Sequence, residues 1–214
     1  MRKQFELQME EMHQQMIRMG ALCEQAITQT NTALLVGDRE LAAATIDLDR
    51  EIDAKEREIE NLCLKLLLQQ QPVAGDLRKI SAALKMITDM ERIGDQAADI
   101  AEISLLMEKA KEGSIRDRLV REMAKATAKM VTESIDAYVR QDLELAEKVI
   151  DDDDIVDGLF DMIRAELIQN IRSGYSDGSN TVNVLMVAKY FERIGDHATN
   201  IAEWVEFSVT GKKP

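Results

Sequence analysis

Carboxylate side chains at helical spacing are the residues of this chain best placed to do chemistry. The phrase ERIGDQA at residues 91–97 returns as ERIGDHA at residues 192–198. In each copy a glutamate precedes an aspartate by four residues, which is about one helical turn, so the two acids share a face. Acids repeated in this way can hold cations, whereas a repeat of apolar residues alone would indicate only packing.

A second pair of acids with the same spacing precedes each copy. Asp49 and Asp53 lie in the preceding helical segment of the first half, and Asp153 and Asp157 occupy the matching places in the second. If neighbouring antiparallel helices bring the pairs face to face, four carboxylates meet and repel one another unless a cation neutralises them. One more helical turn adds a residue on each ERIGD helix. The predicted metal ligands are Asp49, Asp53, Glu91, Asp95 and Asp99 in the first half, and Asp153, Asp157, Glu192, Asp196 and Asn200 in the second.

Oxygen ligands favour hard cations such as Mg²⁺, Mn²⁺, Ca²⁺ or iron and argue against a structural zinc site. The predicted cofactor is a divalent or trivalent metal ion (iron, manganese, magnesium or zinc), and its identity stays open. The alternative is a solvated helix face whose acids pair with nearby arginines, including Arg92 and Arg193. Duplication in register, beside the small residues Gly94, Ala98 and Ala101, favours metal binding, because small residues let a neighbouring helix approach closely.

The composition predicts an all-α protein. Aromatic residues make up 4% of the chain, prolines number 2, and good helix formers dominate. Six long helices are expected at residues 4–36, 38–70, 76–111, 115–140, 142–172 and 180–209. Asp38 and Asp76 are expected to cap the second and third, and Gly37 to end the first. The repeat predicts two three-helix bundles in tandem, at residues 1–112 and 113–214, in an elongated molecule.

Charge and hydropathy exclude several classes of protein. A net charge of −13 disfavours binding along nucleic acid. No apolar run approaches the roughly 20 residues of a membrane span, and the N-terminus lacks the apolar core of a signal peptide. A cytoplasmic location is therefore expected. Cys23 and Cys63 are expected to be buried thiols.

Two other functions stay open at this stage. An iron-carboxylate oxidase or iron-storage protein would need Glu-x-x-His on two helices, and Glu10-x-x-His13 is a single copy. A plain helical scaffold would use the acids only for solubility. His197, next to Asp196, is a candidate ligand, although a surface or supporting place is expected because its counterpart is Gln96.

The duplicated ERIGD phrase, the run QPVA at residues 71–74 before Asp76-Leu77-Arg78, and the Asp49-x-x-Ile52-Asp53 spacing resemble the PhoU family over essentially the whole chain. The resemblance implies that the two three-helix bundles are related by a pseudo-two-fold axis, and that the acid pairs hold multinuclear metal clusters. It also implies a non-enzymatic, cytoplasmic negative regulator of phosphate uptake and of the phosphate-starvation response. The implied partners are the ATPase subunit of the phosphate ABC transporter, the phosphate sensor histidine kinase and a second copy in a homodimer, with membrane contact only through partners.

The two halves differ at three acidic positions. Asp99 corresponds to Asn200, Glu56 to Phe160, and Glu60 to Arg164. The second site therefore carries less negative charge, and we expect it to bind metal more weakly or to hold fewer ions.

Overall fold

The structure is a computed structural model that describes residues 2–70, 72–107, 115–174 and 178–212. All secondary structure within these residues is helical. The elements are α1 (Arg2–Thr32), a π-helical turn η1 (Ala33–Gly37), α2 (Arg39–Gln70), α3 (Ala74–Leu106), α4 (Ile115–Arg140), α5 (Leu143–Arg172) and α6 (Gly178–Thr210).

Aspartates begin the second helix of each repeat. Asp38 Oδ1 accepts hydrogen bonds from the backbone N–H groups of Glu40 and Leu41, and Asp142 Oδ1 accepts one from Leu145. These bonds satisfy N–H groups that have no partner within the helix. Gly37 adopts φ 77° before Asp38, a left-handed conformation that glycine adopts without strain. The predicted cap at Asp38 and the predicted stop at Gly37 are both confirmed.

The third helix differs from the prediction at its start. It begins at Ala74 after an extended Val73, whose side chain makes no capping bond. Asp76 therefore lies in the first turn and does not cap the helix, although its charge still suits the positive end of the helix dipole. The helix ends at Leu106. The predicted end at residue 111 and the predicted boundary at residues 112 and 113 lie outside the described residues.

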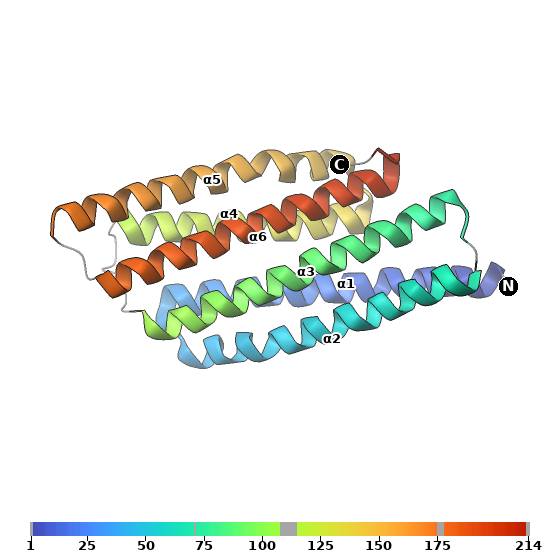
Figure 1. Ribbon diagram of the computed structural model, residues 1–214, viewed down its shortest axis with the longest axis horizontal. Coiled ribbons are helices and arrows are strands. Elements are labelled where there is room, and N and C mark those ends of the chain that lie inside the picture. Colours follow the sequence, from blue (N-terminus) through green and yellow to red (C-terminus); the bar gives the residue numbers. More distant parts are fainter. Residues whose placement is uncertain (1, 71, 108–114, 175–177, 213–214) are drawn as a thin grey trace.

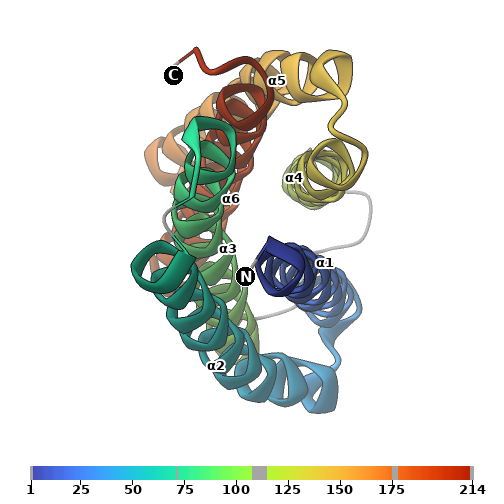
Figure 2. The ribbon, with the colours of Figure 1, turned by 90° about the vertical axis from the view of Figure 1, so that its right-hand side faces the viewer.

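The two three-helix bundles, α1–α3 and α4–α6, lie side by side in an elongated molecule (Figure 1). Seen from the end, α2, α3, α6 and α5 form one layer, and α1 and α4 lie against it (Figure 2). Helices α3 and α6 therefore meet at the middle of the molecule. Buried residues such as Met19, Ile93 and Phe191 belong to one hydrophobic core that runs through both bundles. The predicted all-α fold of six helices is confirmed, and the two repeats share a single core.

Polar contacts also join α3 to α6. Asp89 Oδ1 lies 2.8 Å from His197 Nδ1 and accepts a hydrogen bond of 2.9 Å from Asn200 Nδ2. Burial raises the pKa of Asp99 on α3, and the neighbouring hydroxyl of Tyr190 on α6 opposes this shift. Asp89 and Tyr190 occupy equivalent places in the repeat, as do Asp99 and Asn200, so the contacts are related by the pseudo-two-fold axis. No described helix has the length and hydropathy needed to cross a bilayer.

Candidate metal centre

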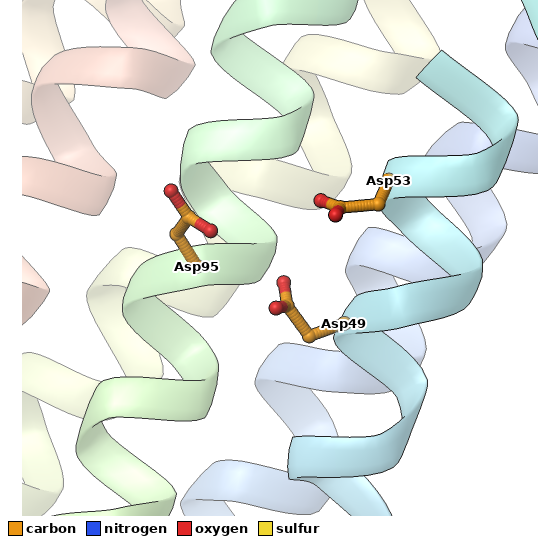
Figure 3. Close-up of side chains that lie close together, drawn as sticks. All are labelled: Asp49, Asp53 and Asp95. Carbon is orange, nitrogen blue, oxygen red and sulfur yellow. The ribbon is translucent and has the colours of Figure 1, made fainter. Parts of the chain in front are cut away.

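Three carboxylates of the first repeat meet between α2 and α3. Asp49 and Asp53 project from successive turns of α2 toward Asp95 of α3 (Figure 3). One oxygen from each side chain lies within 4.8 Å of the other two. All three side chains are half-buried. The predicted face-to-face arrangement of acids thus forms across this helix pair.

Gly94 allows the two helices to come this close. A Cβ at this position would lie 2.9 Å from Ile52 Cδ1 and 3.1 Å from Asp49 Oδ1. Ile52 is fully buried, so its side chain has little room to move. The glycine in the ERIGD phrase therefore places the backbone of α3 directly against the acid pair of α2.

Burial and mutual repulsion make the charged form of this cluster costly. Burial raises the pKa of Asp49 to about 6, and the charges of Asp95, Asp53 and Asp99 contribute in the same direction. Burial, and after it the charge of Asp95, also raise the pKa of Glu91. The positive charge of Arg92 opposes this shift. A cation among these groups would remove the repulsion.

Two arginines offset part of the negative charge, each from the same helix as its partner. Arg92 Nη1 lies 2.7 Å from Asp95 Oδ2, and Arg57 Nη1 lies 3.6 Å from Asp53 Oδ2. Asp49 differs, because its Oδ1 is buried and no described atom donates a hydrogen bond to it. A buried carboxylate oxygen without a donor is unfavourable. Asp49, Asp53 and Asp95 therefore fit a hard cation, which would supply the missing partner.

The second repeat places its acids in the same way across α5 and α6. Burial raises the pKa of Asp153 to about 6, together with the charges of Asp157, Asp196 and Glu192. A Cβ at Gly195 would lie 3.2 Å from Asp153 Oδ1, so the close approach is repeated. Within the described residues, however, no three acids of this repeat bring their oxygens as close together as the first repeat does.

Cationic side chains gather near the second set of acids. Lys189 pairs with Glu192 and lies over the ring of Phe160, with Nζ 5.5 Å from the ring centroid. Arg164 lies 5.9 Å from the same centroid. Phe160 and Arg164 replace Glu56 and Glu60 of the first repeat, so two acids give way to an aromatic ring and a cation. This substitution lowers the negative potential around the second site.

The outer predicted ligands face the other repeat. Asp99 has Tyr190 of the other repeat as a neighbour, which lowers the pKa of its carboxyl against the larger effect of burial, and its charge still raises the pKa of Asp49. The side-chain amide of Asn200 donates a hydrogen bond to Asp89, and His197 contacts the same carboxylate. Sequence reasoning missed Asp89, because its counterpart in the repeat is a tyrosine and carries no acidic signal.

The isolated Glu-x-x-His lies elsewhere. His13 Nδ1 lies 3.0 Å from the hydroxyl of Tyr138 on α4, and Glu10 accepts a hydrogen bond from Gln14. These partners tie the motif to the contact between α1 and α4, away from the acid pairs. The thiols of Cys23 and Cys63 are free and buried, as expected, and burial raises the pKa of each.

The raised pKa of Asp49 predicts a pH-dependent stability of the metal-free protein. The folded pKa of about 6 lies above an unfolded value of roughly 3.9, so the folded state holds the proton more tightly. The contribution of Asp49 to stability is therefore fully present below about pH 4 and is lost as the pH rises through 6. Asp49→Asn removes this loss, and we expect it to stabilise the chelated protein by about 1 kcal/mol at pH 7.5 after allowance for solvent screening. Urea unfolding at pH 4 and at pH 7.5 measures the difference.

Asp47→Asn is the matched control, because it makes the same charge change at an exposed residue whose partner is Arg50. We expect little change from it at either pH. Equal stabilisation by both variants, or a gain from Asp49→Asn that persists at pH 4, would contradict the repulsion within the cluster.

Both repeats of the chain match the same known protein family. The sequence profile of the PhoU domain matches residues 16–104 and again residues 120–205, which together cover both repeats. The chain belongs to the PhoU family. A PhoU homolog of Clostridium acetobutylicum, named a phosphate-specific transport system accessory protein, is 38% identical over 99% of this chain and 97% of its own. A Pseudomonas aeruginosa relative of the same name is 34% identical over 98% of this chain and 86% of its own.

Solved structures of the PhoU family share the fold. The crystal structure of PhoU from Pseudomonas aeruginosa matches with a TM-score of 0.92 and 33% identity, over 97% of this chain and 100% of that one. The phosphate transport system regulatory protein PhoU from Streptococcus pneumoniae matches with a TM-score of 0.89 and 26% identity, over 98% and 99%. The family predicted from the ERIGD repeat is confirmed.

Proposed function

We propose that this protein is a non-enzymatic, metal-binding adaptor that represses phosphate uptake and the phosphate-starvation response. It acts in the cytoplasm by contacting the ATPase subunit of the phosphate ABC transporter and the phosphate sensor histidine kinase. It reaches the membrane only through these partners, and it works as a homodimer. Membership of the PhoU family supports this proposal, as do the names of the relatives as accessory proteins of phosphate-specific transport.

Metal binding is the part of the proposal that rests on this chain's own geometry. Asp49, Asp53 and Asp95 would hold the ion, with Glu91 at the edge of the cluster. The observation that carries it is the buried Asp49 Oδ1, which has no hydrogen-bond partner in the described residues. Iron, manganese, magnesium or zinc would neutralise these carboxylates and tie α2 to α3. The ion would thereby fix the angle between these two helices.

The second site, Asp153, Asp157, Glu192 and Asp196, is proposed to bind metal more weakly. Loss of Asp95 should therefore remove more metal than loss of Asp196. Metal content of purified Asp95→Asn and Asp196→Asn, measured by elemental mass spectrometry after identical dialysis, tests this. Equal losses from the two variants would contradict the difference between the repeats.

Recovery of partners from cells tests the adaptor function. We expect tagged protein from phosphate-replete cells to co-purify the transporter ATPase and the sensor kinase, identified by mass spectrometry. An Asp49→Asn/Asp95→Asn bait should recover less of both, because α2 and α3 lose the ion that ties them. An Asp47→Asn/Asp136→Asn bait has the same charge and should behave as wild type, since both acids are outside the clusters and pair with exposed arginines. Recovery of neither partner would overturn the adaptor proposal.

A further inference from the structure

The second repeat carries an apolar groove on its outer face, between α4 and α5. It is open and shallow, with a volume of about 580 Å³. Ile155 and Met162 of α5 line it and are 53% and 50% exposed, and Leu159 lies beneath them. Gly158 lies between the two exposed side chains, and a Cβ there would meet nothing within 4 Å. The missing side chain leaves a notch in an otherwise apolar stripe.

The first repeat has no such stripe at the equivalent place. Ile155, Gly158 and Met162 correspond to Glu51, Ala54 and Glu58. Leu159 corresponds to Lys55, which forms a salt bridge to Glu58 and a hydrogen bond to Gln15. The face of the first repeat is therefore an ordinary charged surface. The first repeat folds in the same way with charged residues at these positions, so the fold does not require the apolar residues of the second repeat.

The edge of the groove on α5 is acidic. Glu147, Asp151 and Asp154 are all exposed on this helix, and neither Asp151 nor Asp154 makes an ion pair with any described residue. On α4 the edge is mixed, with Glu122 and Lys125 lining the groove. A partner that covers the stripe must bring apolar residues for its centre and positive charge for the α5 edge. A second copy of this chain, at a net charge of −13, brings the wrong sign.

We propose that the α4/α5 groove docks a basic amphipathic helix of a partner protein. The groove presents Ile155, Leu159 and Met162 along one face of α5, and a helix enters such a groove with its own apolar side chains at i, i+3 or i+4, and i+7. The notch at Gly158 receives a large apolar side chain of that helix, and Lys or Arg residues on one flank meet Asp151 and Asp154. The groove gives the proposed adaptor a docking surface distinct from its metal-binding face. This inference rests on the proposed function in one respect, which is that an adaptor has a partner protein to dock.

A synthetic helical peptide tests the groove without a known partner. The probe is a peptide of about five helical turns with leucines along one stripe and lysines on both flanks. A peptide of the same composition, with its leucines scattered around the helix, has the same charge and no stripe. We expect the striped peptide to bind wild type at least about tenfold more tightly in fluorescence anisotropy, since only it buries apolar surface. Hydrogen exchange should slow in residues 119–130 and 150–165.

I155E/M162E gives the groove the residues that the first repeat carries at these positions. Two added negative charges strengthen attraction to any basic peptide, so an expected loss of about tenfold or more in affinity reports the apolar contact alone. L68E/I171E adds the same charge at exposed apolar residues elsewhere and should not weaken binding. Circular dichroism melting checks that both variants fold.

Results of three kinds would overturn the proposal. Equal affinity for the scattered peptide would show attraction by charge alone. Unchanged binding by I155E/M162E, or protection away from α4 and α5, would place the peptide elsewhere. A wild-type dimer in light scattering that becomes a monomer in I155E/M162E would assign the groove to a second copy. All three leave the recovery of transporter and kinase from cells unaffected, so this proposal can fail without the adaptor function failing.

Discussion

Manganese added to the chelated protein is expected to raise its melting temperature by about 5–10 °C when Mn²⁺ stands about 100-fold above its dissociation constant. Binding to the folded state alone contributes about 2.7 kcal/mol at that ratio, and a chain of this size gains about 2–4 °C per kcal/mol. The physical source is relief of repulsion among Asp49, Asp53 and Asp95 and a partner for the buried Asp49 Oδ1. Differential scanning calorimetry with and without chelator measures it.

The variant Asp49→Asn/Asp95→Asn should lose more than half of this metal-induced shift. The relevant quantity is the shift and not the melting temperature itself, because removal of repulsion also stabilises the metal-free variant. Asp47→Asn/Asp136→Asn carries the same net charge and should keep the full shift. A shift that is equally large in both variants would mean that Mn²⁺ binds outside the cluster, and no shift in wild type would favour a plain helical scaffold.

Gly94→Ala is expected to destabilise the protein by up to about 2 kcal/mol, although alanine is the better helix former. Alanine contributes about 1 kcal/mol of helix propensity, and overpacking against a buried side chain costs about 1–3 kcal/mol. The new Cβ would lie 2.9 Å from Ile52 Cδ1 and 3.1 Å from Asp49 Oδ1, so the buried Ile52 side chain must shift or α3 must move away from α2. Urea denaturation in chelator measures the stability, and a smaller Mn²⁺ shift should accompany the loss because the acid pairs move apart.

Two other glycines make a graded series with Gly94. Gly195→Ala meets one tight contact, the movable Asp153 Oδ1 at 3.2 Å, and should leave stability nearly unchanged. Gly158→Ala meets nothing within 4 Å and should stabilise by about 0.5–1 kcal/mol. All three variants replace glycine with alanine, so the order of their changes in stability reports how much space surrounds each position. Stabilisation by Gly94→Ala would contradict the close approach of α2 and α3.

The repeat made most of the fold predictable. Long amphipathic stretches ended by Gly37 and begun by Asp38 give helix bounds directly, and in-register duplication indicates two copies of one helical unit. The core that the two bundles share was harder to predict from the sequence. Residues such as Phe191 are apolar on a helix face, and periodicity shows that such a face is buried without showing which helix covers it. The start of α3 was misplaced because Asp76 has the residue type of a cap while the chain is already helical at Ala74.

The first acid cluster was predictable because each of two neighbouring helices carries its own pair of acids at helical spacing. Asp49 and Asp53 share a face of one helix, Glu91 and Asp95 share a face of the next, and Gly94 indicates close approach. Contacts between the repeats could not be found in the same way. The link from Asp89 to His197 joins positions with no common motif, and only the placement of α6 against α3 brings them together.

We propose that the carboxylates between α2 and α3 surround a cation. Anomalous X-ray scattering from crystals grown with Mn²⁺ tests it most directly. We expect a strong anomalous peak within coordination distance of Asp49, Asp53 and Asp95, and a weaker one beside Asp153 and Asp196. The contrary result is an empty map in which these carboxylates turn to bulk water or are neutralised by arginines alone.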